Sequence, residues 1–290
     1  MKSAHMKIHA AIVAALLLPM APCVSAPSVG DPPAAMTLWL EGNGLKLKTS
    51  IYESPRLSSH PVLVVVLHGD LLGVRNVPPT TYHYVFADEA ARRIEDVVVA
   101  AVLRPGYRDH SKERSDGNMG MATGDNYTPE VVDAVAGIIE QLKERFHPSH
   151  TVLAGHSGGA AITGDLLGRR PSTVDGALLV SCPCDLVAWR EHMKKMQPKN
   201  SIWSKPIHAL SPQELAPKVS PAVHVAVLVG ANDDVAPPAM SRDYAETLKL
   251  RVSNVTLTVA PEFGHEILLE PVAYETLTSL VESLRRSERR

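Results

Sequence analysis

The sequence predicts an α/β protein whose mostly parallel sheet is covered by helices on both faces. Short segments rich in Val, Leu and Ile recur along the chain and alternate with longer amphipathic segments, which is the pattern of βα repeats. Several of the short segments are continuously apolar, as is typical of parallel strands that are buried on both faces. Six such segments follow one β-hairpin, so we expect eight strands.

The predicted strands follow one another in a regular order. Residues 37–41 and 45–52 flank Gly42-Asn43-Gly44 and are expected to form the hairpin. The other six strands are expected at residues 61–67, 97–103, 151–155, 177–180, 223–229 and 255–259.

Residues 129–146 give the clearest helix signal. Thr128 is suited to cap the helix and Pro129 to occupy its first position. One face is apolar, with Val131, Val135, Ile138, Ile139 and Leu142. A last helix is expected at residues 272–285. Because right-handed crossovers bring every βα loop to one edge of a parallel sheet, we expect functional residues of these loops to meet there.

A glycine-rich pentapeptide, Gly155-His156-Ser157-Gly158-Gly159, directly follows the third of these six strands and precedes small residues suited to a helix. In this context a G-x-S-x-G sequence predicts a sharp turn that lifts the serine hydroxyl above the sheet edge. Ser157 is therefore a candidate nucleophile, and the N–H of Gly158 a candidate donor to an oxyanion. The alternative is an ordinary glycine-rich turn with a surface serine.

A serine hydroxyl becomes nucleophilic when a base takes its proton and a carboxylate orients that base. Later loops offer both, in the order acid then histidine. Asp233 and Asp234 follow the seventh predicted strand, and His265 follows the eighth. His208 is the other downstream histidine in a predicted loop. The residues alone leave the choice between the two aspartates open.

Ser157, Gly230-x-x-Asp233 and Gly264-His265 together resemble the α/β-hydrolase superfamily, over residues 37–285. The resemblance implies an α/β-hydrolase fold: a mostly parallel eight-stranded sheet, helices on both faces and a small cap insertion at residues 185–220. In the superfamily's G-x-x-D pattern the acid is Asp233. The approach to the acid strand resembles dienelactone-hydrolase and prolyl-oligopeptidase-like members, without the propeller of true prolyl oligopeptidases.

The same resemblance implies a second oxyanion donor in the loop His68-Gly69-Asp70. The backbone N–H of Asp70 is the expected donor, with that of Leu71 as the alternative. A carboxylate beside a forming oxyanion would raise its energy, so the Asp70 side chain is expected to point away or to be paired. His68 is expected to pack and to hydrogen-bond beneath this loop.

Residues 104–127 form a long, polar, glycine-rich loop at the predicted catalytic edge. Loops of this length are usually functional, and we expect it to form a wall of the substrate pocket. Tyr107, Tyr127, Asp125 and Arg104 are its candidate substrate contacts, although an ion pair beneath the loop is the favoured role for Arg104. The insertion is expected to hold two or three short helices and to bring Trp189 to the substrate.

The N-terminus has the features of a secretory leader. Lys2 and Lys7 precede an apolar stretch at residues 10–18, and small residues end at Ala26. We therefore expect a signal peptide at residues 1–26, a hydrolase domain at residues 27–290, and export to the periplasm or the medium. Cys23 leaves a lipoprotein as the alternative. No segment approaches the roughly 18 apolar residues of a membrane span, so stable membrane insertion is not expected.

Charge and cysteine content exclude several classes of protein. The net charge is −2 and no basic stripe is visible, so nucleic acid is not an expected partner. Cys182 and Cys184 cannot make a zinc site alone, and no metal or cofactor is expected. The two cysteines are expected in a structural loop. A bridge across one residue would be strained, yet a labile disulfide is open to them in an oxidising compartment.

These features predict an exported serine hydrolase that cleaves small carboxylic esters through an acyl-enzyme, with Ser157, Asp233 and His265 as its triad. A small aminopeptidase or acyl-peptidase acting on short peptides would use the same residues. A non-catalytic binding protein on this fold is a third hypothesis, disfavoured because every triad position is filled.

Overall fold

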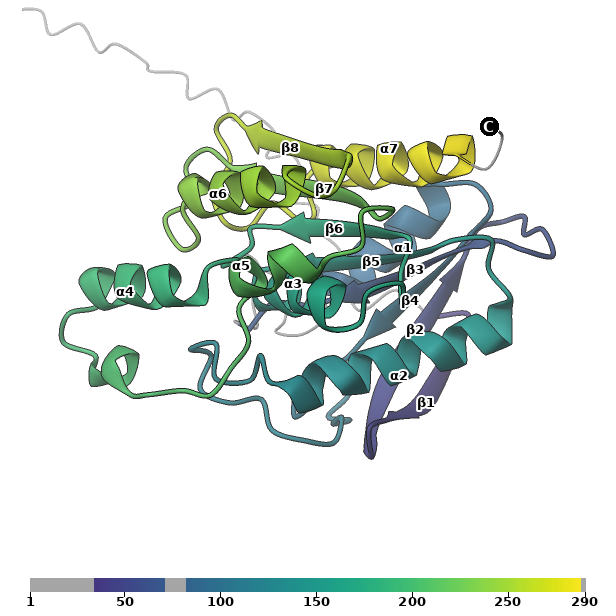
Figure 1. The fold of residues 1–290 in the computed structure, drawn as a ribbon. Coiled ribbons are helices and arrows are strands. Elements are labelled where there is room, and N and C mark those ends of the chain that lie inside the picture. The colour runs from purple at the N-terminus through teal and green to yellow at the C-terminus, as the bar shows by residue number, and fades with distance from the viewer. Residues whose placement is uncertain (1–33, 71–81, 288–290) are drawn as a thin grey trace, which may run out of the picture. The chain divides into compact units, whose positions relative to one another are not determined.

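In the described part of the chain, one sheet of eight strands lies between helices (Figure 1), in the order β1-β2-β4-β3-β5-β6-β7-β8. The computed structural model describes residues 34–70 and 82–287. The pairs β1–β2 and β2–β4 are antiparallel, and the other neighbours are parallel. The predicted mostly parallel, eight-stranded sheet is therefore confirmed. The predicted signal peptide lies outside the described residues.

The strands begin and end within a few residues of the predicted positions. They are β1 (Met36–Gly42), β2 (Leu45–Glu53), β3 (Val62–Leu67), β4 (Val97–Val102), β5 (Thr151–His156), β6 (Gly176–Val180), β7 (His224–Gly230) and β8 (Asn254–Ala260). Every residue of β3, β4, β5, β6 and β7 is buried. This burial explains why these segments are continuously apolar in the sequence.

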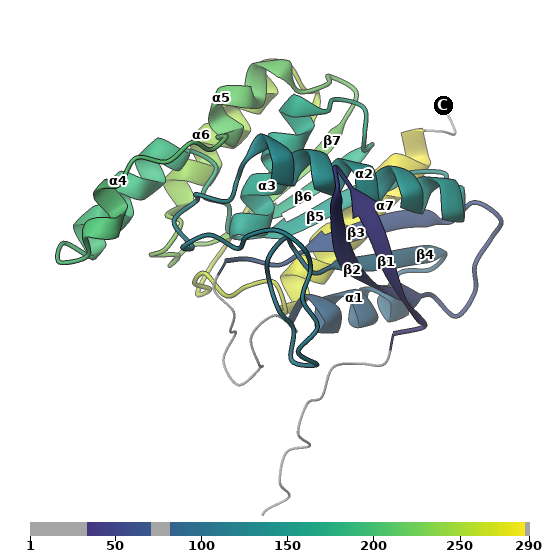
Figure 2. The same ribbon diagram turned by 90° about the horizontal axis from the view of Figure 1, so that it is seen from below.

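Helices cover both faces of the sheet (Figure 2). On one face, α2 (Pro129–Phe146), α3 (Gly158–Arg169) and α6 (Pro238–Lys249) contribute to one apolar core. On the other face, α1 (Tyr82–Arg93) and α7 (Pro271–Ser287) contribute to a second core. The side chains of each buried strand alternate between these two cores, which ties the three layers together.

Helix α2 begins and ends as its sequence predicts. The Thr128 hydroxyl accepts a hydrogen bond from the N–H of Val131 at 3.4 Å, and Pro129 occupies the first turn. His147 adopts the left-handed conformation after the last turn and donates its N–H to the carbonyl of Lys143. The five apolar residues predicted for one face of α2 are buried in the core.

The insertion after β6 contains α4 (Leu186–Met196), η1 (Ser201–Ser204), α5 (Pro212–Leu215) and η2 (Ala216–Lys218). In Figure 1, α4 lies on the side toward which the arrowheads of β6 and β8 point. Arg190 connects the insertion with the long loop after β4. Its guanidinium donates to the carbonyl of Thr123 at 2.6 Å and to that of Lys205 at 2.6 Å. None of the helices in the described ranges is long and apolar enough to cross a membrane.

Asp165 on α3 is fully buried, and neither carboxylate oxygen has a hydrogen-bond partner among the described residues. Burial, with a smaller effect of Glu214, raises its pKa well above the ordinary value. An unfolded aspartate ionises near ~4, so above that pH folding must take up a proton and the free energy of unfolding decreases. We predict that Asp165→Asn raises the free energy of unfolding by about 1–3 kcal/mol at pH 8.

The gain should shrink as the pH falls through ~4 and vanish below it, where both states carry the proton. Urea unfolding at several pH values measures it. Asp133→Asn is the matched control, because hydrogen bonding to Arg169 lowers the pKa of Asp133. In this control the free energy of unfolding should be lower than that of the wild type at neutral pH and should approach it in acid. The change therefore has the opposite sign to that of Asp165→Asn. An Asp165→Asn gain that does not depend on pH would contradict the prediction.

Candidate active site

Ser157 sits at the turn from β5 into α3, with φ 53° and ψ −121°. Its N–H donates to the carbonyl of Val180 on β6 at 2.8 Å, which fixes the turn against the sheet. A Cβ at Gly159 would overlap the carbonyl oxygens of Leu67 and His68, because α3 begins directly against the end of β3. This close approach is the physical reason for the glycine, and it leaves the serine hydroxyl at the sheet edge.

The structure brings together the three residues predicted to form a triad. His265 Nε2 lies 2.9 Å from Ser157 Oγ. His265 Nδ1 lies 3.0 Å from each carboxylate oxygen of Asp233. The Asp233 side chain is fully buried, whereas the His265 side chain remains 11% exposed. This arrangement can move a proton from the hydroxyl to the imidazole while the carboxylate holds the opposite nitrogen.

Asp233, rather than its neighbour Asp234, faces the histidine. One Asp233 carboxylate oxygen also accepts the N–H groups of Val235 at 3.0 Å and Ala236 at 2.8 Å. Asp234 is exposed, and its backbone carbonyl lies 2.7 Å from His192 Nε2. The other candidate base, His208, is exposed and does not line the pocket beside Ser157.

Gly158 occupies the first position of α3, where an N–H group has no acceptor within its helix. Asp70, in the loop after β3, lies beside Gly158. A Cβ at Gly158 would overlap the Asp70 carboxylate. The carboxylate is fully engaged: it accepts from Tyr127 Oη at 2.6 Å, Arg104 at 2.9 Å and Tyr107 Oη at 3.2 Å. Asp70 is thus paired, as expected. Leu71, the alternative donor, lies outside the described residues.

A buried ion pair stabilises the loop after β3. Arg104 is fully buried and donates to both the Asp70 carboxylate and the carbonyl of His68. The His68 ring accepts the N–H of Arg104 at 3.0 Å, and its Nδ1 lies 2.8 Å from the carbonyl of Gly69. Burial above all, then the neighbouring His83 and Arg104, lowers the pKa of His68 well below its ordinary value. Arg104 therefore forms an ion pair, the role favoured for it, and His68 packs and hydrogen-bonds beneath the loop after β3, as expected.

A pocket of about 240 Å³ opens beside Ser157. Its apolar wall comes from the insertion and the loop after β4, with Met121, Ala122, Trp189, Met193, Ile202 and Trp203. Trp189 and Trp203 meet edge to face, with ring centroids 5.4 Å apart. Their indole N–H groups donate to Val235 and Gln197, so the polar atoms are satisfied and the ring surfaces shape the pocket. Trp189 therefore lies where it was predicted to meet substrate.

Two predicted substrate contacts are wrong. Tyr107 and Tyr127 are fully buried and do not line the pocket. Their hydroxyls point to the Asp70 carboxylate, whose burial requires hydrogen-bond donors. The Asp125 carboxylate is also engaged within the protein: it accepts hydrogen bonds from the N–H groups of Met121 and Thr123 in the same loop. The loop does form a wall of the pocket, but it does so through residues 121–123. The apolar pair Met121-Ala122 within a polar loop was the sequence signal for this.

Sequence reasoning missed three residues around His265. The carbonyl of His265 lies 3.0 Å from His156 Nε2 and 2.9 Å from Ser181 Oγ. The other nitrogen of His156 lies 3.1 Å from Tyr82 Oη. The position of His156 beside the nucleophile was its only sequence signal, and nothing in the sequence places Tyr82 at the site.

Cys182 and Cys184 form a disulfide, and both are fully buried in the loop after β6. This loop directly follows Ser181 and leads into α4, so the bond braces the segment between the site and the insertion. Among the described residues, no group of three or more His, Cys, Asp or Glu side chains is placed to hold a metal ion.

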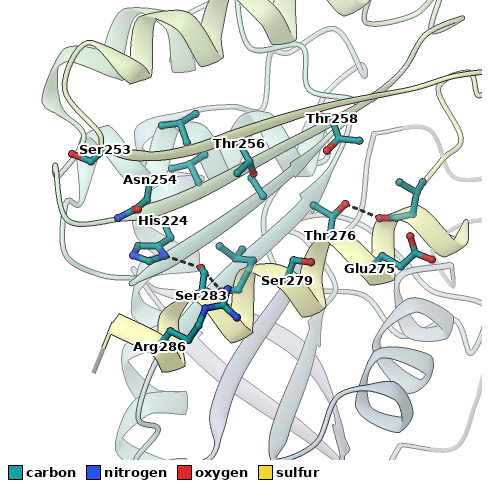
Figure 3. A pocket seen from close by; sticks show the side chains of 15 residues that line it. His224, Ser253, Asn254, Thr256, Thr258, Glu275, Thr276, Ser279, Ser283 and Arg286 are labelled. Carbon is teal, nitrogen blue, oxygen red and sulfur yellow. Dashed lines mark hydrogen bonds between the residues drawn. The ribbon is translucent and has the colours of Figure 1, made fainter. Parts of the chain in front are cut away.

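A second hollow of about 590 Å³ lies between β8 and α7 (Figure 3). One serine and one histidine of its lining are in contact: His224 Nδ1 lies 2.8 Å from Ser283 Oγ. The Ser283 hydroxyl already donates its one proton to the carbonyl of Leu280 at 2.8 Å. His224 must then be the donor, so it cannot act as a base toward this serine. His224 also begins β7, at the edge of the sheet opposite to Ser157.

The matching family model is the prolyl oligopeptidase family, over residues 93–282. Fold and site define a serine hydrolase of the α/β-hydrolase fold. The chain belongs to the prolyl oligopeptidase family, as its resemblance implied. A comparison with curated protein sequences gives no match.

Solved structures with a similar fold include esterases and a peptidase. Est1E from Butyrivibrio proteoclasticus, with ferulic acid bound, is 14% identical with a TM-score of 0.63, covering 86% of this chain and 99% of that chain. The esterase Pf2001 from Pyrococcus furiosus is 16% identical with a TM-score of 0.62, covering 87% and 90%. The acylaminoacyl peptidase from Pyrococcus horikoshii is 14% identical with a TM-score of 0.65, covering 85% and 41%.

We predict that Asp70→Asn lowers the free energy of unfolding by about 3–5 kcal/mol, because it leaves the buried Arg104 charge without its carboxylate. Urea unfolding measures the change. Asp88→Asn is the matched control: it breaks the exposed helical pair with Arg92 and should cost less than about 1 kcal/mol. Equal effects of the two substitutions would show that the buried pair does not stabilise this loop.

Proposed function

We propose that this protein is a serine esterase that cleaves small, neutral carboxylic esters through an acyl-enzyme. The observation that carries the proposal is the alignment of Ser157, His265 and Asp233 at the mouth of an apolar pocket. Hydroxyl, imidazole and carboxylate are within hydrogen-bond distance in the order that nucleophilic catalysis requires.

In the proposed reaction, Ser157 Oγ attacks the ester carbonyl as its proton passes to His265 Nε2. The N–H groups of Gly158 and Asp70 would hold the negative oxygen. The imidazolium then returns the proton to the leaving alcohol, and the acyl group stays on Ser157. Water, deprotonated by His265, releases the acid and restores the hydroxyl. Asp233 keeps its charge throughout and orients the imidazole.

The lining of the pocket favours neutral substrates over free peptides. An aminopeptidase needs a carboxylate to pair with the substrate amine, since an unpaired buried charge is costly. The Asp70 carboxylate lies at the pocket, but this carboxylate already accepts hydrogen bonds from Arg104, Tyr107 and Tyr127. Glu266, the other carboxylate that lines the pocket, is exposed to solvent. The two indole rings of the wall instead suit an aromatic or alkyl group. The complex of Est1E with ferulic acid supports an aromatic acyl group.

An acyl-peptidase is the second candidate. The family match and the similarity to the Pyrococcus horikoshii acylaminoacyl peptidase favour it. An N-acylated peptide has no free amine, so the occupied Asp70 carboxylate does not argue against it. A non-catalytic binding protein is disfavoured, because binding alone gives no reason for the aligned triad.

We also propose that the protein is exported, to the periplasm or the medium. The support is the charged, apolar and small-residue sequence of residues 1–26, together with the Cys182–Cys184 disulfide, a bond that persists in oxidising compartments.

Substitutions in the triad test the proposed chemistry. Ser157→Ala should lower kcat by about four to six orders of magnitude without unfolding the protein, because triad residues act as a unit. Asp233→Asn should cost on the order of 10⁴-fold, since the amide favours the wrong imidazole tautomer. Asp234→Asn is the matched control and should keep nearly full activity. Steady-state hydrolysis of a p-nitrophenyl ester measures all three.

A fluorophosphonate probe gives an independent readout of the same site. It should label Ser157 alone, because only a serine paired with a base is nucleophilic enough at neutral pH. Labelling at another serine, or full activity of Ser157→Ala, would contradict the proposed mechanism.

A substrate panel separates the esterase from the peptidases. We predict that p-nitrophenyl esters with aromatic or short alkyl acyl groups are hydrolysed with a kcat/KM at least ~10²-fold above that of aminoacyl p-nitroanilides, which carry a free amine. N-acetylated aminoacyl p-nitroanilides form the third arm. If this third arm matches the esters, the acyl-peptidase is the correct assignment.

A further inference from the structure

The carbonyl of His265 is held by two donors from other parts of the sheet edge. His156 Nε2 lies 3.0 Å from this carbonyl and Ser181 Oγ lies 2.9 Å from it. Ser181 is the first residue after β6, and His156 is the last residue of β5. The loop that carries the candidate base is therefore fixed through its backbone, independently of the contact between its ring and Asp233.

The direction of each hydrogen bond follows from the carbonyl. A carbonyl only accepts, so the proton of His156 must sit on Nε2. Its Nδ1 is then an acceptor, and the Tyr82 hydroxyl, 3.1 Å away, must donate to it. The Tyr82 oxygen in turn accepts the backbone N–H of Gly69. Each hydroxyl and ring proton is used once, and the chain of bonds runs in one direction.

Burial keeps this chain in a single protonation state. His156 and Tyr82 are 2% and 1% exposed. Burial, and then the neighbouring His265, lowers the pKa of His156 to about 3. The ring is therefore neutral near pH 7, and its tautomer is set by the Tyr82 hydroxyl on one side and by the carbonyl of His265 on the other.

The far end of the chain lies at the proposed oxyanion hole. Gly69 directly precedes Asp70, and a Cβ on Gly69 would lie 2.9 Å from Ser157 Cβ and 3.0 Å from Tyr82 Oη. The loop is thus seated between the nucleophile and the tyrosine, so a small movement of Gly69 moves the N–H of Asp70 relative to Ser157.

We propose that Tyr82 and His156 are positioning residues: Tyr82 holds Gly69 and Asp70, and His156 holds the backbone of His265, at the right distance from Ser157. This inference rests on the proposed function, because it assigns these two residues a part in the same reaction. Neither residue touches the reacting atoms through its hydrogen bonds: Tyr82 acts through Gly69, and His156 acts through the backbone of His265.

Tyr82→Phe tests the oxyanion end. It removes only the hydroxyl, so the Gly69 N–H loses its acceptor. We expect kcat to fall about 10- to 100-fold while KM for a p-nitrophenyl ester stays within about twofold, because loop placement matters most in the transition state. The inhibition constant of phenylboronic acid, which forms a tetrahedral adduct with serine, should rise by a similar factor. Rates are referred to the concentration of fluorophosphonate-reactive enzyme.

Tyr244→Phe is the matched control for the loss of a buried hydroxyl. Tyr244 lies on α6, is fully buried, and its hydroxyl has no hydrogen-bond partner in the described part of the chain. The Tyr244→Phe variant should have the same kcat, KM and affinity for phenylboronic acid as the wild type. A merely structural role of Tyr82 would change only the stability, which urea unfolding measures for both variants.

His156→Leu and His156→Gln test the other end. The leucine removes the donor to the His265 carbonyl, and kcat should again fall about 10- to 100-fold. The glutamine amide reaches a similar position with an N–H, so it should restore most of this loss. Equal activity of the two variants would show that the donor has no positioning role.

The result that overturns the inference is distinct from a failure of the proposed function. If the wild-type enzyme reacts with the fluorophosphonate at Ser157 but Tyr82→Phe keeps the wild-type kcat and boronic acid affinity, the positioning role is wrong and the esterase proposal stands. If the wild-type enzyme does not react, the proposed function itself fails.

Discussion

The close approach of the start of α3 to the end of β3 is the constraint on which the rest of this structure depends. It places the carbonyls of Leu67 and His68 directly against Gly159, and it forces Ser157 into a positive φ. A backbone in that region is costly for a residue with a side chain, and it persists only where the surroundings over-determine it. Here the bond from Ser157 to Val180 and the two cores beneath the turn provide that support.

Two buried carboxylates near Ser157 differ in their partners. Asp233 faces His265, while the buried carboxylate of Asp70 is neutralised by Arg104 and screened by two tyrosine hydroxyls. Burial lowers the pKa values of His68 and His156, so neither adds a charge near the serine. Because charges interact strongly in a low-dielectric interior, this difference lets the proposed oxyanion meet hydrogen-bond donors rather than a free carboxylate.

The order of elements could be predicted because each strand and helix leaves a local signal. Buried parallel strands need continuous apolar segments, α2 needs a cap and an apolar stripe, and a tight elbow needs glycine. The substrate wall could not be predicted in this way. Tyr107 and Tyr127 are the large aromatic residues of the loop after β4, yet they turn inward to Asp70, and residues 121–123 face the pocket instead. Which side chains of an irregular loop face outward depends on which buried polar groups beneath the loop need hydrogen-bond partners.

The sequence by itself determined the eight strands, the elbow, the candidate serine and histidine, and the mostly parallel topology that gathers them at one edge. The choice of Asp233 over Asp234 rested on resemblance alone until the structure placed Asp233 against the ring. Only the tertiary structure decided that Cys182 and Cys184 are bonded, and that Tyr82 reaches His156 across 74 positions of chain. The physical reason is the range of the interactions. Propensity, capping and burial patterns act within a few residues, whereas a hydrogen bond joins any two groups that the packed strands and helices bring within about 3 Å.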